Sequence, residues 1–471
     1  MEGYRPTIGL EIHAELKTQT KMFCACANDP DEKRPNTNIC PVCMAHPGSL
    51  PVVNREAVRK VLLVGTALSG ELADFTEFDR KNYFYPDIPK GYQISQYAYP
   101  LVRGGVLNGV AITRVHLEED TARSQHIGEN SLVDFNRAGV PLMELVTEPV
   151  IHSAGEAGAF ARELQLLLRA LGAGEAHMEK GEMRVEANIS VSKESSLGTK
   201  VEVKNLNSFK SAERAIAHEI ERQIALLEQG GQVVQETRGW DEVKQTTFSQ
   251  RKKESSHDYR YFPDPDLPKL MISEISEFSG EILKAALPML PWERRAQYLA
   301  QGLQEDDADM FVRDRLLGDF FDTAVQNVPP KAAVVAANYI GSDIAGRREG
   351  GEVPDVWLRD KDNAQHFAEL ILLIQNGMLS SRGAKDTLVR MLTSEDSPEA
   401  IAKEHGLIQK NDTKALVPVA AKIIQAHPQV VADYKAGKEA ALQFLVGQGI
   451  KETKGAANPT ILREEFIKAL K

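Results

Sequence analysis

Cysteine is scarce in this chain: four are present among 471 residues, and all of them lie between positions 24 and 43. Long apolar runs are lacking too, because no stretch approaches the roughly 18 apolar residues that a membrane-spanning helix needs. Residues 1–7 show no apolar core of the kind that a secretory signal carries. We therefore expect a cytoplasmic protein that contacts no membrane, in a compartment where disulfides are rare.

The common nucleotide-binding signatures are missing as well. The sequence contains no GxxxxGK(S/T) and no GxGxxG placed after a predicted strand, so any ATP site is of neither kind. The formal net charge of -11 argues against a general nucleic-acid coat, although it permits a local basic face. With 42% hydrophobic and 26% charged residues, the composition is that of an ordinary globular protein.

The four cysteines form two short motifs, CxC at Cys24 and Cys26 and CxxC at Cys40 and Cys43. A polar, turn-rich loop separates them, and Pro41 turns the second motif. This spacing suits tetrahedral zinc held by four thiolates, while spare reduced thiols and a redox or catalytic role remain the alternatives. Because four thiolates leave zinc no open position, we expect a structural staple.

The character of the chain changes along its length. Up to about residue 270, short alternating segments between Gly and Pro turns predict mixed strands and helices, whereas helical periodicity dominates from about Glu281. A polar stretch at 409–413 marks a further boundary. We therefore predict an α+β fold with a mixed-sheet domain over 1–290, an all-α helical domain over 291–408 and a small all-α tail domain over 409–471.

Two amphipathic stretches in the first domain predict core-packed helices. The first follows Ser153 and places apolar residues at helical spacing up to Leu171. The second begins after Asn207 or Ser208 and runs to the glycine pair at 230–231. Serine and asparagine are favoured N-caps and glycine favours the position after a helix, so we interpret both stretches as scaffold.

Carboxylates recur on the polar side of several predicted strands. Alternation over 8–14 buries the apolar set and places Glu11 and His13 on the other face. Glu186 and Glu202 occupy the same kind of position in predicted strands near 185–191 and 201–204. A solvated strand face is the alternative for each acid, but together the acids and one imidazole suit Mg²⁺ or Mn²⁺.

A fourth acidic element is His116-Leu-Glu-Glu-Asp120. Simple alternation places Glu118 on the polar face together with His116 and turns Glu119 to the apolar face. A bulge or strand end at this point would reverse that assignment. The residue pattern alone leaves both possibilities open.

Two connectors, residues 79–97 and 251–266, interleave cationic side chains with aromatic ones between prolines and glycines. This mixture suits phosphates together with a stacked base, as in a nucleotide or single-stranded nucleic acid. A tyrosine-rich loop with a purely structural role is the alternative.

These motifs together resemble the GatB family, the transferase subunits of the aspartyl/glutamyl-tRNA(Asn/Gln) amidotransferases, and the resemblance extends over essentially the whole chain. It is carried by Gly9-Leu-Glu-Ile-His13, Asp79-Arg-Lys-Asn-Tyr-Phe-Tyr-Pro86, Gly91-Tyr-Gln-Ile-Ser-Gln96, His116-Leu-Glu-Glu-Asp120, Lys204-Asn-Leu-Asn-Ser208, Asp258-Tyr-Arg-Tyr-Phe-Pro263, Phe444-Leu-Val-Gly-Gln448 and Lys454-Gly-Ala-Ala-Asn-Pro459.

The resemblance implies a cradle-shaped catalytic domain over 1–290, followed by the helical domain and a tail domain that contacts tRNA. It implies a ligase that is active as a heterotrimer, together with an amidase and a small bridging protein, the A and C components of the complex. Such an enzyme uses ATP and Mg²⁺ to phosphorylate the side-chain carboxylate of Glu-tRNA(Gln) or Asp-tRNA(Asn). Ammonia from the amidase then arrives through a channel and yields Gln-tRNA(Gln) or Asn-tRNA(Asn).

The resemblance also implies roles for single residues. It assigns the magnesium site to Glu11, His13, Glu119, Glu144, Glu186 and Glu202, and on this ground we adopt Glu119 over Glu118. It makes Lys81, Lys90 and Arg184 contacts of phosphate or of the tRNA acceptor end. The cysteines Cys24, Cys26, Cys40 and Cys43 match a zinc-bearing subset of the family, which supports a structural zinc.

Two other classes of function compete with this one. A metal-dependent hydrolase or nuclease could use the same acids and would act without ATP. A non-catalytic, zinc-stapled RNA-binding scaffold would keep its function when Glu11 is replaced by alanine.

Overall fold

The computed structural model describes residues 3–252, 259–409, 413–453 and 457–470. The chain divides into two compact units, Met1–Pro291 and Trp292–Lys471. The second unit contains the helices expected for both the helical and the tail domain. The boundary predicted between 408 and 409 adjoins residues 410–412, which lie outside the described residues, so the three-domain division stays a prediction.

The first unit is built around a ten-stranded sheet in the order β15-β14-β13-β12-β1-β11-β8-β6-β2, with β7 paired to β8 beside this path. Strands β13 and β14 run parallel, and the central pairs around β1 are antiparallel. The strands are β1 (Arg5–Glu15), β2 (Glu71–Leu72), β6 (Val102–Arg103), β7 (Val106–Leu107), β8 (Val110–Glu119), β11 (Pro141–Thr147), β12 (Met183–Ser192), β13 (Val201–Leu206), β14 (Glu236–Asp241) and β15 (Thr246–Lys252).

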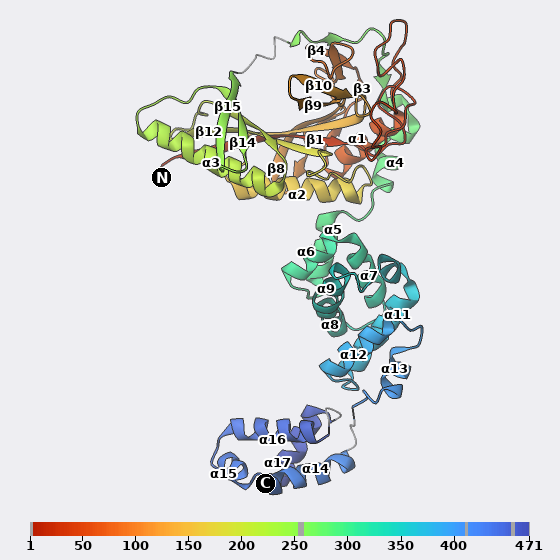
Figure 1. Ribbon diagram of the computed structural model, residues 1–471, viewed down its shortest axis with the longest axis vertical. Coiled ribbons are helices and arrows are strands. Elements are labelled where there is room, and N and C mark those ends of the chain that lie inside the picture. Colours follow the sequence, from red (N-terminus) through yellow and green to blue (C-terminus); the bar gives the residue numbers. More distant parts are fainter. Residues whose placement is uncertain (1–2, 253–258, 410–412, 454–456, 471) are drawn as a thin grey trace. The chain divides into compact units, whose positions relative to one another are not determined.

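Among the described residues of the first unit, four α-helices accompany the sheet: α1 (Arg55–Ala67), α2 (Ala154–Ala170), α3 (Phe209–Glu228) and α4 (Gly280–Ala285). Ser153 caps α2 and Ser208 caps α3, each with its side-chain oxygen accepting from a backbone N–H of the first turn. Both predicted helices are thereby confirmed. Figure 1 shows α2 and α3 along one side of the sheet, where they cover its apolar face.

The central strand β1 shows why the sheet has two different faces. Ile8, Leu10 and Ile12 are fully buried, whereas Glu11 and His13 between them are half-buried on the other face. Alternation of side chains along a strand produces this separation. The helices cover the apolar set, which leaves the polar set on the opposite side of the sheet.

Small sheets lie on that opposite side, where Figure 1 shows β4, β9 and β10. They contain β3 (Phe75–Thr76), β4 (Asp79–Asn82), β5 (Tyr92–Ser95), β9 (Arg123–Ile127), β10 (Asn130–Asp134), β16 (Phe262–Pro263) and β17 (Leu270–Met271). Strand β4 pairs with both β5 and β16, so it joins the two connectors that the sequence singles out. Residues 253–258 of the second connector lie outside the described residues.

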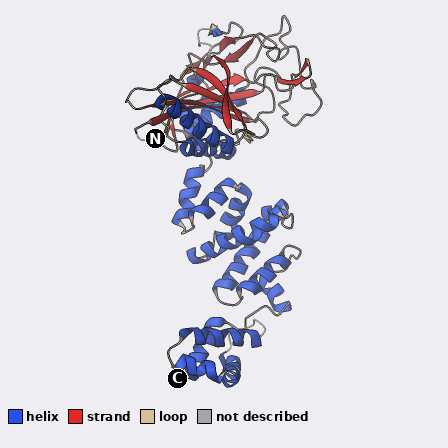
Figure 2. Ribbon diagram, turned by 60° about the vertical axis from the view of Figure 1, so that its left-hand side comes forward, coloured by secondary structure: helices blue, strands red, loops and turns tan. Residues whose placement is uncertain are grey.

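The second unit is helical among its described residues, and Figure 2 shows the strands confined to the first unit. The mixed sheet followed by helices confirms the α+β class. Among the described helices, none combines the length and apolarity that a membrane crossing demands. The helices are α5 (Pro291–Ala300), α6 (Glu305–Arg313), α7 (Arg315–Val325), α8 (Pro330–Tyr339), α9 (Ala345–Glu349), α10 (Asp355–Arg359), α11 (Lys361–Gln375), α12 (Ser381–Met391), α13 (Pro398–Glu404), α14 (Thr413–Ala426), α15 (Pro428–Lys435), α16 (Glu439–Glu452) and α17 (Pro459–Leu470).

Candidate functional site

The register of the central strands assembles the predicted acids on one face of the sheet. Glu11 of β1 lies opposite Glu186 of β12, and His13 lies opposite Glu144 of β11 on its other side. Directly opposed residues of antiparallel strands share a face and have neighbouring side chains. Glu202 of β13 joins them because it is paired with Asn188, two residues beyond Glu186.

Three of these side chains form a first possible metal-binding triad: His13, Glu118 and Glu144. The His13 Nε2 atom lies 3.5 Å from Glu118 Oε1 and 3.4 Å from Glu144 Oε2. The buried Oε2 atom of Glu118 has no hydrogen-bond partner among the described residues. A buried carboxylate oxygen is costly without a partner, so this atom is suited to a cation ligand.

A second triad consists of Glu11, Glu186 and Glu202, whose ligand atoms also lie within 4.8 Å of one another. Asn188 donates to Glu11 Oε1 at 2.7 Å, which orients that carboxylate. Thr237 donates in the same way to Glu202 Oε2 at 2.8 Å. Both triads offer the hard oxygen and nitrogen ligands that Mg²⁺ and Mn²⁺ take in proteins.

His13 and Glu144 of the first triad shift each other's pKa values. Burial opposes the charged form of His13, but the hydrogen bond to Glu144 and the charges of Glu144, Glu118 and Glu186 raise its pKa to about 9. Burial also opposes the charge of Glu144, yet the nearby His116 and His13 hold the pKa of Glu144 well below its usual range. The site therefore favours an ionised Glu144, which needs a positive partner.

A cavity of about 600 Å³ contains both triads. Its ionisable lining comprises six carboxylates and four basic side chains, besides His13 and His116. They are Glu11, Glu118, Asp120, Glu144, Glu186 and Glu202, with Lys81, Arg114, Arg184 and Lys204.

Tyrosines from both connectors form another part of the cavity wall. Tyr83 and Tyr85 come from the first connector and Tyr259 and Tyr261 from the second. The Lys81 Nζ atom lies 5.1 Å from the centroid of the Tyr259 ring. This places a cation beside aromatic faces in the same cavity as the acids.

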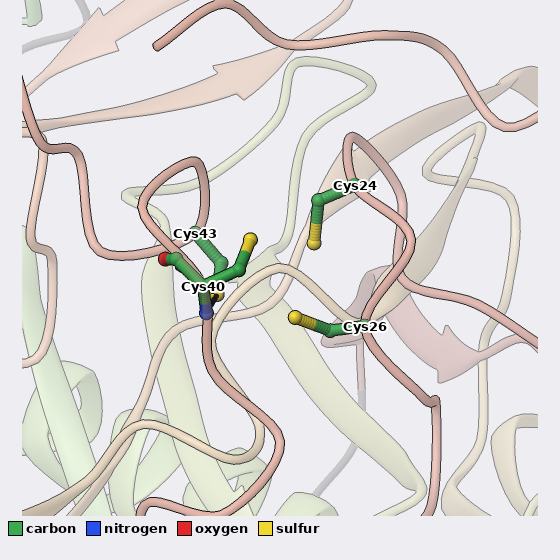
Figure 3. Close-up of side chains that lie close together, drawn as sticks. All are labelled: Cys24, Cys26, Cys40 and Cys43. Carbon is green, nitrogen blue, oxygen red and sulfur yellow. Dashed lines mark hydrogen bonds between the residues drawn. The ribbon is translucent and has the colours of Figure 1, made fainter.

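The four cysteines gather near the cavity-bearing sheet in a separate cluster. Their Sγ atoms lie within 4.8 Å of one another, and all four thiols are free of disulfide bonds. Figure 3 shows Cys24 and Cys26 pointing toward the loop that carries Cys40 and Cys43. The arrangement offers four sulfur ligands to one ion, as the spacing predicts.

A fully buried lysine lies against this cluster. The Lys21 Nζ atom is 3.9 Å from Cys43 Sγ and donates to the backbone oxygen of Phe135 at 3.1 Å. Burying an ammonium group is unfavourable unless negative charge lies nearby. Thiolates, unlike neutral thiols, provide that charge, and this favours a metal-bound state of the cluster.

Sequence comparison identifies the family. A family described as "GatB/GatE catalytic domain" matches residues 6–276, and one described as "GatB domain" matches residues 319–470. The chain is 42% identical to the B subunit of an aspartyl/glutamyl-tRNA(Asn/Gln) amidotransferase from Carboxydothermus hydrogenoformans, over 99% of this chain and 100% of that protein. The chain belongs to the GatB family.

Other relatives with the same name agree. The protein of Moorella thermoacetica is 44% identical over 98% of each chain, and that of Thermotoga maritima is 43% identical over 99% of each. The resemblance inferred from the motifs is thus confirmed, and it covers both units of this family member.

One choice between neighbouring residues differs from the structure. We expected Glu119 to face the metal, but Glu118 joins His13 and Glu144 instead. The strand keeps its alternation to its end, because the irregularity between β11 and β8 falls at Val146 and Thr147, far from Glu118. Without a bulge at the acidic pair, Glu119 points away from the triads.

Glu119 has its own partners on that other side. Its Oε2 atom accepts from Lys90 Nζ at 2.6 Å, and its Oε1 atom accepts from the backbone N–H of Ile94. Glu119 and Lys90 line a smaller cavity of about 310 Å³ beside Cys24 and Cys43. Lys90 is therefore not among the residues that line the cavity of the triads, whereas Lys81 and Arg184 are.

Sequence reasoning missed several side chains of the site. His116 lies 3.3 Å from Glu144 Oε2, and Lys204 lies 2.8 Å from Glu186 Oε2. His116 lies two residues from Glu118 in the same strand, and Lys204 lies two residues from the predicted ligand Glu202. That period-2 spacing was a usable signal for each of them.

Proposed function

We propose that this family member catalyses the ATP-dependent amidation of glutamate or aspartate attached to tRNA(Gln) or tRNA(Asn). In this proposal it acts in a complex with two partners, an amidase and a small bridging protein. The observation that carries it is the pair of hard-ligand triads in one cavity, flanked by Lys81, Arg184 and the connector tyrosines.

The charge of the cavity supports this reaction class. The substrates of the proposed reaction are both anions, a nucleoside triphosphate and a side-chain carboxylate. The cavity wall carries six carboxylates of its own. Like charges repel, so the anions can meet there only if cations intervene. Divalent cations, when bound at the triads, neutralise phosphoryl charge and align the reacting oxygens.

In this proposal the basic and aromatic residues of the cavity bind and orient the substrates. Lys81 and Arg184 line the cavity and present positive charge to phosphate or to the aminoacyl end of the tRNA. Although burial opposes its charge, the charges of the Glu118 and Glu144 carboxylates raise the pKa of Lys81, so it stays protonated. The tyrosine faces offer stacking surfaces for a base.

The chemistry needs no nucleophile from the protein. An oxygen of the substrate carboxylate attacks the γ-phosphorus of ATP, the bond to the β-phosphate oxygen breaks, and ADP leaves. Ammonia next attacks the carbonyl carbon of the acyl phosphate, the carbon–oxygen bond to phosphate breaks, and the nitrogen loses a proton. The carboxylates of the triads would hold the cations, which would supply charge neutralisation to both steps.

The cysteine cluster has a different part in this proposal. Four thiolates around one Zn²⁺ would leave no open coordination position, so the ion would brace the loop between Cys26 and Cys40. That loop already contacts a turn far along the chain, since Thr37 and Asn38 donate their backbone N–H groups to Asn136 Oδ1.

The proposal is tested with the chain reconstituted with its amidase and small partners. Amide formation on Glu-tRNA(Gln) and Asp-tRNA(Asn) is measured with and without ATP, Mg²⁺ and glutamine. We expect activity to require all of them and to fall by about 100-fold or more in Glu144→Gln, because the carboxylate is ionised at the site.

A matched control is Glu221→Gln, which removes an exposed carboxylate from α3. We expect it to leave amide formation unchanged. Hydrolysis of RNA or of another substrate without ATP, abolished by the same Glu144 variant, would instead support a metal-dependent hydrolase. Full activity in Glu144→Gln would leave a binding scaffold as the better account.

A further inference from the structure

The second triad is contacted by a positively charged side chain of the protein, Lys204. The Nζ atom of Lys204 lies 2.8 Å from Glu186 Oε2 and 3.6 Å from Glu202 Oε1. Its side chain is 30% exposed, and the two carboxylates are 18% and 8% exposed. The ammonium group thus bridges two of the three carboxylates that would bind a divalent ion.

The local backbone places Lys204 there. Pairing of β12 with β13 passes from Ala187 opposite Val203 to Val185 opposite Leu206, so β13 has one extra residue across from Glu186. Asn205 takes a positive φ of 63° at this point. A bulge of this kind bends the strand and redirects its side chains, which brings Lys204 over Glu186.

The first triad has no lysine in such a close ion pair among the described residues, although the charges of Glu118 and Glu144 act on Lys81. Its close positive partners are His13, a ligand of the triad itself, and His116 at 3.3 Å from Glu144 Oε2, and the nearest guanidinium contact is Arg114 Nη2 at 3.8 Å from Glu144 Oε1. A histidine can change from counter-ion to ligand by losing a proton. Lysine offers no such exchange at neutral pH, so its side chain has to move.

Two cations cannot use the same carboxylate oxygens at once. Magnesium or manganese binds carboxylate oxygens at about 2.0–2.2 Å. An ammonium held at 2.8 Å from Glu186 Oε2 repels a divalent ion that approaches the same oxygen. The four-carbon stem of lysine lets the ammonium swing into the cavity, which Lys204 also lines.

We propose that Lys204 is a displaceable counter-ion of the second triad. Its ammonium group holds Glu186 and Glu202 together while the triad is empty, and it leaves them when a divalent cation enters. This inference rests on the proposed function, because it presumes that Glu11, Glu186 and Glu202 bind a metal. Once displaced, Lys204 presents its charge to the anionic substrates expected in the same cavity.

The first test measures Mn²⁺ binding to the full chain by electron paramagnetic resonance. We expect the wild-type protein to bind two Mn²⁺ ions, the more weakly held one at the second triad. Glu11→Gln should lose that more weakly bound ion. Lys204→Met keeps the length of the side chain and removes its charge. We expect the weaker site to bind Mn²⁺ about tenfold more tightly in this variant, the scale on which groups beside metal ligands change affinity.

Lys17→Met serves as the matched control, because Lys17 Nζ forms a similar ion pair with Glu175 at 2.7 Å on the surface. It should leave both Mn²⁺ affinities unchanged. Lys204→Arg keeps the charge, so its weaker site should bind no more tightly than that of the wild-type protein.

A second measurement uses the wild-type protein and needs no variant. An amine-reactive acylating reagent followed by peptide mass spectrometry reports the labelling rate of each lysine. Saturating Mn²⁺ should raise the rate at Lys204 several-fold, because the ion pair is broken, while Lys17 should keep its rate. The same experiment with Glu11→Gln should show no rise at Lys204.

The outcomes separate this inference from the proposed function. If two Mn²⁺ ions bind and the weaker affinity is unchanged or lower in Lys204→Met, the displacement of Lys204 is refuted while the metal sites stand. An unchanged labelling rate at Lys204 under saturating Mn²⁺ refutes it equally. If neither the wild-type protein nor Lys204→Met binds Mn²⁺, both the metal sites and the inference fall.

Discussion

The cysteine cluster and the carboxylate face are built in opposite ways. The four sulfur ligands come from two turns within twenty residues of chain, and their Sγ atoms meet through local folding. The six ligands of the triads come from five strands and span positions 11 to 202. The first site depends on a loop, and the second depends on the register of a whole sheet.

This difference teaches what each site can tolerate. The bound ion closes the loop of the cysteine cluster. We therefore expect loss of a cysteine ligand mainly to lower the free energy of unfolding. A sheet face is formed before any ion arrives, because the apolar side of the same strands packs on α2 and α3. Loss of one of its carboxylates should therefore change binding and leave folding nearly intact.

The largest expected effect is a difference in protein stability between variants of the two sites. Cys40→Ser should abolish binding of one equivalent of zinc and destabilise the first unit by about 3 kcal/mol, because the loop loses its cross-link. Calorimetry with zinc analysis measures both quantities. Glu118→Gln should keep the zinc and the melting temperature of the wild-type protein, and an equal loss of stability in both variants would contradict the contrast.

The next effect concerns the neighbouring pair Glu118 and Glu119. Glu118→Gln should weaken Mn²⁺ binding at the first triad by about 100-fold, because a charged ligand is lost. Glu119→Gln should leave that affinity within about twofold, since Glu119 pairs with Lys90 in the other cavity. Titration with Mn²⁺ compares the two variants, and the reverse ranking would restore Glu119 as the ligand.

The pH dependence of metal binding sharpens the comparison further. With its pKa raised to about 9, His13 is protonated at neutral pH and must lose that proton before it can bind a metal. Apparent affinity at the first triad should therefore rise about tenfold per pH unit well below pH 9, and about 25-fold from pH 7.0 to 8.5. Mn²⁺ titrations at several pH values measure this slope.

His13→Asn is the control for that slope. It should bind Mn²⁺ more weakly but with little dependence on pH, because the titrating ligand is gone. A slope as steep as that of the wild-type protein would assign the proton to another group.

The smallest expected effect concerns the zinc affinity of the cysteine cluster. Lys21→Met should weaken zinc binding by about tenfold, because the buried ammonium beside Cys43 Sγ no longer offsets thiolate charge. Competition with a chromophoric chelator measures the affinity, and Lys21→Arg should recover part of it. Unchanged zinc affinity in Lys21→Met would show that this lysine serves only its contact with Phe135.

Much of the fold followed from local patterns. The caps at Ser153 and Ser208 and the alternation in β1, β12 and β13 were all visible in the sequence. Alternation also places Glu118 on the face of His13 and Glu144, where the structure has it, whereas the resemblance favours Glu119. The resemblance implies that Lys90 contacts phosphate or the acceptor end, but its Nζ atom donates to Glu119 Oε2.

The sequence by itself determined the ligand types, the tetrathiolate spacing and the polar face of each strand, because these depend on residues close together in the chain. Only the tertiary structure decided which faces meet. The order β13-β12-β1-β11-β8 brings Glu202, Glu186, Glu11, Glu144 and Glu118 side by side, and the bulge at Asn205 adds Lys204. Such pairings depend on strand register, which is set by packing between distant segments rather than by local spacing.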